Sequence, residues 1–370
     1  MNLDFTEEQD MLRETVRGVC DELASPAVVR AMEDDPKGYP DDLWKQFAEL
    51  GLTGIIIPEQ YGGSDMGMME AAITYEELGS RLCPSPHFHS AILSAKILLA
   101  SGSEDQKSEW LPKIASGDSI LTPAWLEPHN GFGPKGVQVR AQASGGGFTI
   151  SGTKLHVHFA SEADRLLVLA RTGDAEEDVS IFLVDPSAKG VSLIQLKSLS
   201  SDTQYRVDFD GVEVSQGDIV GNWASFNATM YEGVILLAAL AVGGSGRALE
   251  LTVEFAQQRE QFDKPIAAFQ AISHYLADAS TNLAGARTLM YEAAWASGAG
   301  KPIARLAPMA KMFACQTYRD LTAMAEQVFG GVGFTVEYDI QLYFRRAKQL
   351  QISWWDTSYL EELIASELLD

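Results

Sequence analysis

The feature that most constrains the fold is a change of periodicity in the middle of the chain. From about Ser119 to Gly221 the sequence has short β-rich runs, separated by turns rich in Gly and Asp, at 148–150, 166–170, 181–184 and 207–209. Apolar residues at helical spacing dominate on both sides. An order of helices, strands and helices favours separate layers over alternating βαβ units. The pattern predicts an α+β protein with an N-terminal helical domain over 1–118, a middle β-domain over 119–221 and a C-terminal helical domain over 222–370; a length of 370 residues suits two or three domains.

Local signals place several helices. Thr6 and Gln9 form a potential capping box before an apolar stripe, which predicts an N-terminal helix. A second amphipathic helix is expected near 41–50, ended by Gly51. The helical pattern resumes at Met68 and is expected to run to about 111, just before Pro112. A long helix is predicted over 230–258, and its most apolar part, 234–242, is too short to span a bilayer and indicates a buried helix.

Net charge narrows the choice of partners. The chain carries a formal charge of −23, so its surface should repel nucleic acid and anionic membranes, although a local basic site could still bind an anionic ligand. The three cysteines, Cys20, Cys83 and Cys315, are scattered and suggest neither a disulfide framework nor a metal site. The acidic N-terminus lacks the apolar run of a secretory signal. These features predict a cytoplasmic protein.

Two kinds of motif invite a functional interpretation that their context does not support. The pairs His87/His89 and His156/His158 could each present two imidazoles on one face of a strand, but no Cys or carboxylate cluster completes a metal site. A structural or ligand-lining role is favoured, and no metal is predicted. The glycine cluster at Gly243 lies inside a helical run without a preceding strand, which indicates close helix packing rather than a dinucleotide fingerprint.

Five motifs in order across nearly the whole chain carry a resemblance. They are GLTGIIIPEQYGG, LTPAWLEPHNGFG, ISGTKLHVHFASEADRLLVLAR, REQFDKPIAAFQAISHYLAD and QVFGGVGFTVEYDIQLYFRRAK. Together they resemble the acyl-CoA dehydrogenase family. The resemblance implies an N-terminal helical domain, a middle β-barrel domain and a C-terminal four-helix bundle. It also implies FAD as cofactor, an acyl-CoA thioester as substrate, α,β-dehydrogenation as reaction, and an oligomer whose FAD lies across a subunit interface.

The last two motifs supply the residues expected at the diphosphate and adenine of FAD. A guanidinium offers a diphosphate a planar fork of donors with a permanent charge, which suits Arg259 to this role. Glycines let backbone N–H groups approach the phosphates without a Cβ in the way. By resemblance, the cofactor-binding residues are Arg259, Phe262, Gln270, Gln327, Gly330 and Gly331.

The catalytic position departs from the family pattern. The resemblance implies a glutamate that removes the α-proton while the flavin takes the hydride. At its usual place this chain has Trp354, or Trp355 with a shift of one residue, and at the alternative place used by some members it has Gly233. Two nearby carboxylates could substitute. Asp356 is one methylene shorter than glutamate. Glu232 precedes Gly233, so on a helix its side chain is turned by about 100° from that position.

Residues expected beside the flavin ring have also changed. The family's Thr-Glu-Pro is Leu126-Glu127-Pro128 here, and a serine near the phosphates is replaced by Phe132. The aromatic and hydroxyl residues that line the ring correspond to His156 and His158. The ring side has therefore lost hydrogen-bond donors, whereas the diphosphate side keeps its pattern.

Four functional hypotheses follow from this split pattern. The leading one is a non-catalytic subunit of a heteromeric acyl-CoA dehydrogenase, which completes the FAD site of a related, glutamate-bearing chain within a heterotetramer. The second is a homo-oligomeric dehydrogenase whose base has moved to Asp356 or Glu232. The third is a family enzyme whose chemistry needs no α-proton abstraction. The fourth is a structural or regulatory homologue that binds no flavin.

Overall fold

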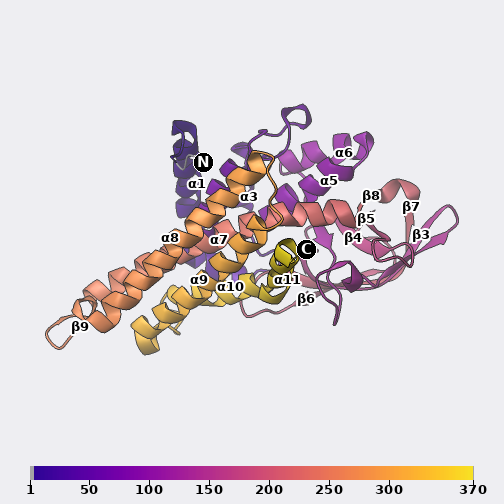
Figure 1. Cartoon of the computed structure of the whole chain (residues 1–370). Helices are drawn as coiled ribbons and strands as arrows, with labels where there is room; N and C mark the ends of the chain where they lie inside the picture. Colours follow the sequence, from indigo (N-terminus) through magenta and orange to yellow (C-terminus); the bar gives the residue numbers. More distant parts are fainter. Residues whose placement is uncertain (1–3, 370) are drawn as a thin grey trace. The chain divides into compact units, whose positions relative to one another are not determined.

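The computed structural model describes residues 4–369, which fall into two compact units built from separate stretches of chain. Unit 1 contains the described residues up to Val29, then Met68–Cys83, and everything from Val234 onward. Unit 2 contains Arg30–Gly67 and Pro84–Gly233. The predicted order of helices, β-sheet and helices is confirmed (Figure 1). Unit 1 therefore joins N-terminal and C-terminal helices that lie far apart in the sequence.

Unit 2 contains the β-sheet and the shorter helices. Its strands are β1 Leu121–Ala124, β2 Arg140–Ser144, β3 Gly147–His158, β4 Arg165–Arg171, β5 Val179–Val184, β6 Val191–Leu196, β7 Gln204–Ser215 and β8 Ile219–Asn222. Its helices are the second part of α2 (Pro26–Asp34), α3 Asp41–Glu49, a π-helical segment Phe88–Ser94, α5 Ala95–Ser101, α6 Glu104–Ala115 and the start of α7 (Trp223–Gln258). The expected helix near 41–50 is confirmed.

The sheet is a single path of strands with mainly antiparallel neighbours. Its order is β6-β7-β3-β2-β4-β5-β8, and β1 pairs with β4 in parallel. The β3–β7 ladder has two register shifts, one between Ile150 and Gly152 and one between Lys154 and Val157. No ladder joins β6 to β8 within the described residues. The second register shift changes which side chains face the core near the end of β3.

The expected continuous helical pattern from Met68 to 111 is wrong in its limits. Helix α4, Met68–Ser80, ends well before the π-helical segment, and α6 continues through Pro112 to Ala115. Proline removes one helical hydrogen bond, but Trp110, Leu111 and Ile114 are buried on this helix. Burial of these side chains keeps the last turn helical.

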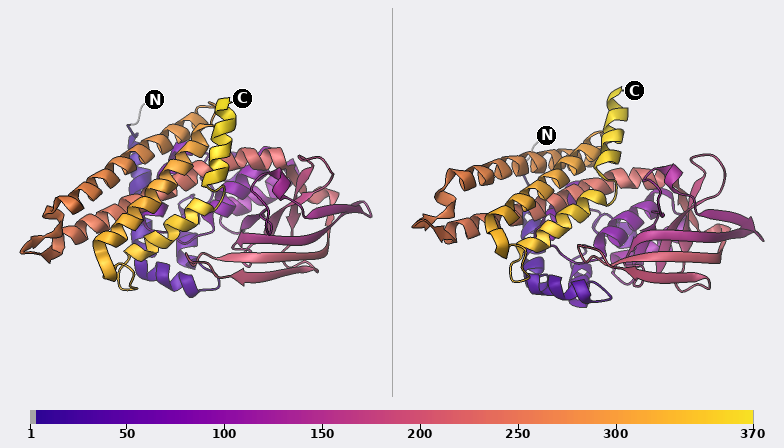
Figure 2. Two further views of the ribbon diagram at one scale, coloured as in Figure 1. Left: turned by 60° about the horizontal axis from the view of Figure 1, so that its bottom comes forward. Right: turned by 90° about the horizontal axis from the view of Figure 1, so that it is seen from below.

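Unit 1 is helical. Its helices are α1 Glu7–Leu23, α4, the rest of α7, α8 Gln270–Gly298, α9 Leu306–Phe329, α10 Ile340–Ile352 and α11 Thr357–Leu369, and a hairpin of β9 Glu260–Gln261 and β10 Lys264–Pro265 joins α7 to α8. The long helices α8 and α9 run side by side (Figure 2). Thr6 caps α1 through the predicted capping box with Gln9. The expected close packing at Gly243 is confirmed, because a Cβ there would lie 1.8 Å from the carbonyl oxygen of Glu76.

Buried carboxylates on α4 join this helix to α8 and to α1 within unit 1. The Glu76 carboxylate on α4 accepts hydrogen bonds from Arg287 Nε at 2.8 Å and from the Tyr291 hydroxyl, both on α8. Arg17 of α1 donates two hydrogen bonds to Glu77 at 2.9 and 3.0 Å. Because both carboxylates are almost fully buried, these bonds are needed to offset the loss of hydration.

Helix α7 is the one described helix that is long and apolar enough to cross a membrane by length and composition. Of its most apolar window, 67% is buried inside the protein. The stretch 234–242 is buried except at Leu240, as expected from the sequence. This degree of burial is typical of the core helix of a globular unit.

Candidate functional site

One end of unit 1 brings together the two C-terminal motifs. The rings of Phe255 on α7 and Phe329 on α9 stack with centroids 4.2 Å apart, and Tyr338 lies edge-on to both. Arg259 follows one turn after Phe255, and its backbone N–H donates to the Phe255 carbonyl at 2.8 Å. Gly330 directly follows Phe329. The aromatic stack therefore places the guanidinium motif and the glycine motif at the same end of the unit (Figure 1).

The polar residues predicted for the cofactor at this end are exposed. Arg259, Gln270 and Gln327 all face solvent. Within residues 4–369 none of the three side chains has a hydrogen bond or an ion pair, so a surface salt bridge between Arg259 and Glu260 is not formed. A permanently charged guanidinium and two amides with unused donors are suited to an external anionic or polar ligand.

The glycine loop leaves room for a ligand to approach the backbone. Gly330 has φ +67°, a conformation that favours glycine, and a Cβ on either Gly330 or Gly331 would meet no atom within 4 Å. Gly333 differs, because a Cβ there would lie 2.3 Å from Glu326 Oε2. The first two glycines thus face open space, whereas the third makes room for a buried carboxyl.

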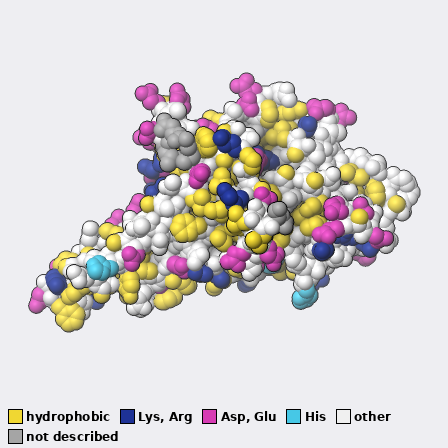
Figure 3. Space-filling model, in the orientation of Figure 1, with side chains coloured by type: hydrophobic (Ala, Val, Ile, Leu, Met, Phe, Trp, Pro, Cys, Tyr) yellow, Lys and Arg dark blue, Asp and Glu magenta, His cyan; other side chains and the backbone are white. Residues whose placement is uncertain are grey.

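Phe262 lies at the tip of the β9–β10 hairpin. It has φ +55° and the next residue, Asp263, has φ +61°. Phe262 is 86% exposed. Two consecutive left-handed residues are the signature of a tight hairpin turn, and a bulky residue in this region is uncommon. Hydrophobic side chains gather on the surface at this end (Figure 3). The turn presents an aromatic ring outward, where a ligand or another chain could cover it.

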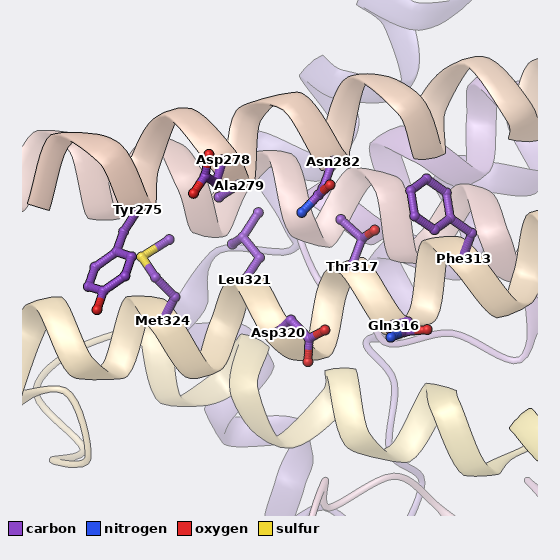
Figure 4. Close-up of a pocket in the computed structure, with 10 residues that line it drawn as sticks. All are labelled: Tyr275, Asp278, Ala279, Asn282, Phe313, Gln316, Thr317, Asp320, Leu321 and Met324. Atoms are coloured by element: carbon purple, nitrogen blue, oxygen red, sulfur yellow. The ribbon is translucent and has the colours of Figure 1, made fainter. Parts of the chain in front are cut away.

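A groove between α8 and α9 lies beside this end of the unit (Figure 4). Its volume is about 400 Å³, and Tyr275 and Met324 line its end near the cofactor motifs. Asp278 and Asp320 also line the groove, and no Lys or Arg does. A cavity with this charge does not suit a diphosphate, so we assign the candidate anion site to the exposed loop and hairpin instead.

The predicted base position carries no carboxylate. Trp354 and Trp355 have φ +53° and +75°, and both are buried. The loop that holds them is fixed by Lys311, whose Nζ donates to the carbonyls of Ser353 at 2.8 Å, Trp355 at 2.7 Å and Leu350 at 3.3 Å. Lys311 is completely buried, and desolvation lowers the pKa of its ammonium. Its three carbonyl partners replace the lost hydration.

The possible substitute bases have structural bonds. Asp356 Oδ1 accepts the backbone N–H of Tyr359 at 2.9 Å, so this carboxylate caps the N-terminus of α11. Glu232 forms an ion pair with Lys96 of α5. A Cβ at Gly233 would lie 2.9 Å from the Leu93 side chain, so this position has no room for a larger residue unless Leu93 moves. Neither alternative presents an unbonded carboxylate.

In unit 2 a buried ion pair shapes the loop that follows β1. Lys154 Nζ donates to Glu127 Oε1 at 2.6 Å, and Lys154 is 0% exposed. Glu127 also accepts the backbone N–H groups of Gln138 and Val139, each at 2.9 Å. Desolvation lowers the pKa of Lys154 to about 8, although the Glu127 charge opposes the shift. The pair therefore ties both ends of the 127–139 loop to β3.

His156 and His158 do not follow the regular alternation of a strand. The register shift between Lys154 and Val157 breaks the alternation, and His156 adopts φ +55°. As a result His156 is exposed, whereas the buried His158 ring stacks on His89 with centroids 4.2 Å apart. The Gln204 amide contacts His156 Nδ1 at 2.7 Å through its oxygen and His158 Nε2 at 3.3 Å through its nitrogen.

Asp202 completes this histidine cluster. Its Oδ2 lies 3.3 Å from His158 Nε2, and Ser200 donates to Oδ1 at 2.7 Å. Burial raises the pKa of Asp202, but its hydrogen bonds with His158, Ser198 and Ser200 outweigh burial and hold the pKa well below its usual range. No group of three or more His, Cys, Asp or Glu side chains suited to a metal occurs among the described residues.

The other two ring-side positions pack against neighbouring residues. Phe132 lies 5.9 Å from the Trp125 ring, which in turn packs on Phe226 at 5.1 Å. The carbonyl of Leu126 accepts the Leu155 backbone N–H at 2.9 Å. Phe132 therefore contributes aromatic packing in unit 2, and neither side chain is a hydrogen-bond donor of the kind that the family resemblance led us to expect.

Sequence reasoning missed three polar residues of this arrangement: Lys154, Lys311 and Glu326. Each is buried. Only Lys311 offered a signal, because it stands between apolar neighbours and a buried charge needs a partner. Lys154 and Glu326 have polar neighbours in Thr153 and Gln327, so the sequence did not reveal their burial.

Comparison with known proteins places the chain in a family. Sequence profiles match it over nearly its full length: the acyl-CoA dehydrogenase N-terminal domain at 6–118, the middle domain at 123–212 and the C-terminal domain at 223–368. The probable acyl-CoA dehydrogenase YngJ of Bacillus subtilis is 31% identical over 382 residues, covering 100% of both chains.

Solved structures agree with the sequence match. The ChsE4–ChsE5 complex from Mycobacterium tuberculosis contains a chain with a TM-score of 0.92 and 27% identity, covering 100% of this chain and 99% of that one. PigA with FAD and proline has a TM-score of 0.90 and 25% identity, covering 100% and 99%.

The fold and the two C-terminal motifs define a flavin-dependent dehydrogenase architecture. The chain belongs to the acyl-CoA dehydrogenase family, whose members are FAD flavoproteins.

Proposed function

We propose that this chain is the non-catalytic subunit of a heteromeric acyl-CoA dehydrogenase, and that it completes the FAD site of a related chain bearing the catalytic glutamate. One contrast supports the proposal. The side chains of Arg259, Gln270 and Gln327 are exposed and unbonded within the described chain, whereas the family's base positions hold Trp354 and Gly233. The ChsE4–ChsE5 structure, which contains a chain similar to this one, is a complex of two named proteins. It is a precedent for a heteromeric assembly of this fold.

In this role the residues of unit 1 bind and orient the cofactor. Arg259 would donate to the diphosphate and Gln327 would add a further hydrogen bond, while Gly330 and Gly331 would let the diphosphate approach the loop closely. Gln270 would bond at the adenine side, and Phe262 would cover it with an aromatic face. Bound FAD supplies the acceptor for the hydride that leaves the β-carbon of the acyl thioester. The proton from the α-carbon would pass to the partner's glutamate.

The ring-side positions support a division of labour between subunits. His158 is stacked and bonded inside unit 2, and Phe132 packs on Trp125. Leu126 and the exposed His156 bring no hydroxyl to replace those of the family pattern. A partner that keeps the usual ring-side donors would hold the flavin ring in its own β-domain.

Arg259→Ala should sharply reduce FAD retention in the assembled protein. Loss of a guanidinium that pairs with a desolvated diphosphate should weaken binding by about 2–5 kcal/mol. Flavin absorbance per protein after gel filtration measures the effect. Arg247→Ala is the matched control, because Arg247 lies on the same helix but pairs with Glu250 at 2.9 Å. Equal flavin content in the Arg259 variant and the parent would contradict the assignment.

Expressed alone, the chain should oxidise acyl-CoA thioesters with an artificial electron acceptor at a negligible rate, because neither base position offers a carboxylate. Adding the related chain should restore turnover. Robust activity of the isolated chain that disappears in Asp356→Asn, but survives in Glu232→Gln, would instead show that the base has moved to Asp356.

Assembly offers a direct test of the subunit role. We expect native mass spectrometry of the co-expressed proteins to give two copies of each chain, with flavin only at sites whose ring pocket the partner supplies. A cofactor shared between chains adds its binding free energy to the interface. A pure homo-oligomer with one FAD for each copy of this chain would refute the proposal and favour the relocated-base enzyme.

A further inference from the structure

A buried carboxyl lies directly before the glycine loop. Glu326 is 4% exposed, and neither of its carboxylate oxygens has a hydrogen-bond partner among the described residues. Its backbone carbonyl accepts the N–H of Gly330, so the residue is one helical turn from the loop. Gly333 opens the space that the carboxyl fills. The side chain is thus enclosed between the last turn of α9 and the loop that carries Gly330 and Gly331.

No charged neighbour compensates for this burial. The elements around the end of α9 carry His274 and Asp278 on α8, Glu254 and Arg259 at the end of α7, Glu337 and Asp339 after the loop, and Arg345 and Arg346 on α10. None of these groups is bonded or ion-paired to Glu326 within the part of the chain that the structure describes. A cation is therefore not available to stabilise the carboxylate.

The helix itself also disfavours a negative charge here. Glu326 lies in the last turn of α9, where the helix dipole has its negative end. Burial raises the pKa of Glu326 to about 7, so near neutral pH the group changes its protonation state over a small range. The protonated carboxyl is neutral. The ionised carboxylate is a negative charge beneath a loop that is suited to an anionic ligand.

We propose that Glu326 is a proton-linked determinant of cofactor affinity: its neutral form permits the FAD diphosphate to bind at the Gly330–Gly331 loop, and its carboxylate opposes that binding. The inference rests on the proposed function, because it requires the diphosphate to lie at this loop. It adds a specific consequence, namely that binding of FAD is accompanied by proton uptake at neutral to alkaline pH.

The direction of the pH effect follows from linkage. The carboxyl has a folded-state pKa of about 7, above its ordinary value of 4.5. The stability from this group is therefore fully present below 4.5, is lost as the pH rises through about 7, and changes no further at higher pH. If bound diphosphate raises the pKa further, FAD affinity should fall as the pH rises above 7, by at most about tenfold per pH unit for one linked proton.

The test compares FAD dissociation constants of the complex with its related chain from pH 6 to pH 9. The wild-type constant should rise with pH, whereas Glu326→Gln should bind FAD as tightly at high pH as at low pH. Glu337→Gln is the matched control, since it removes an equal charge from an exposed residue of the same loop and should follow the wild type. Parallel pH profiles for wild type and Glu326→Gln would overturn the proposal.

A second measurement tests the carboxyl without the cofactor. Flavin-free Glu326→Gln should melt at a clearly higher temperature than wild type at pH 8.5, and the difference should be much smaller at pH 5. Equal melting temperatures at both pH values would refute the buried charge and the inference with it. If no variant binds FAD at any pH, the proposed function fails as well, whatever the melting temperatures show. Flavin binding whose affinity does not depend on pH would contradict only the proposed role of Glu326 and not the proposed function.

Discussion

Replacing Lys154 by Met should lower the free energy of unfolding by about 3–5 kcal/mol, because the substitution leaves the buried Glu127 carboxylate without its counter-ion. The ammonium and the carboxylate are 2.6 Å apart, and neither side chain has appreciable access to water. Met fills nearly the same volume, so the effect reports the lost charge rather than a cavity. Urea denaturation at pH 7 measures it.

Lys135→Met is the control for this prediction. Lys135 belongs to the same unit and pairs with Glu176 at 3.2 Å, but its side chain is 83% exposed. An exposed pair of this kind contributes at most about 1 kcal/mol. If both variants lose the same small amount of stability, the Lys154–Glu127 pair does not organise the 127–139 loop.

The second large effect is expected from Lys311→Met, which should destabilise the protein by about 3–6 kcal/mol. Three carbonyl groups, one buried and two part-buried, would lose their donor at once, and a buried unsatisfied group costs about 1–3 kcal/mol. The loop at Trp354 and Trp355 should also loosen, because its left-handed backbone depends on these bonds. Hydrogen exchange of the amides at 354–357 should therefore accelerate.

Lys348→Met provides the comparison for Lys311. Lys348 lies on α10 just before the same loop, is exposed, and donates to Gln351 at 2.9 Å. Its replacement should change neither stability nor exchange at 354–357 by a measurable amount. Unchanged exchange in Lys311→Met would show that the loop is held by the packing of the two indole rings instead.

Periodicity predicted the elements better than their limits. The strands at 148–150 and 166–170 and the helix over 230–258 were predictable, because each buries one face with a regular spacing. The end of α6 was not, since a proline usually stops a helix and here tertiary burial keeps the last turn. The residues that pack against a helix from distant parts of the chain cannot be inferred from the sequence of the helix alone.

The sequence indicated which motifs should share a ligand, and the site they form stays a prediction. Arg259 and Gly330 lie at one end of unit 1, as a shared ligand would require, but the Phe255–Phe329 stack that brings them together joins residues far apart in sequence. The reversal at His156 depends on a bulge, which alternation alone does not reveal. Glu326 escaped notice because its burial, rather than its neighbours in sequence, makes it unusual.

The division of unit 1 between the two ends of the chain has a consequence for its synthesis. Glu76 is made 211 residues before Arg287 and 215 before Tyr291, the groups that accompany it into the core. Until the ribosome has delivered α8, the face of α4 that packs on α8, with the Glu76 carboxylate, stays in water, while unit 2 already has all its strands. Contacts between residues so far apart in sequence slow folding and leave apolar surface exposed until they form. We therefore expect this half of the protein to assemble after translation, when a chaperone or a companion subunit can still reach it.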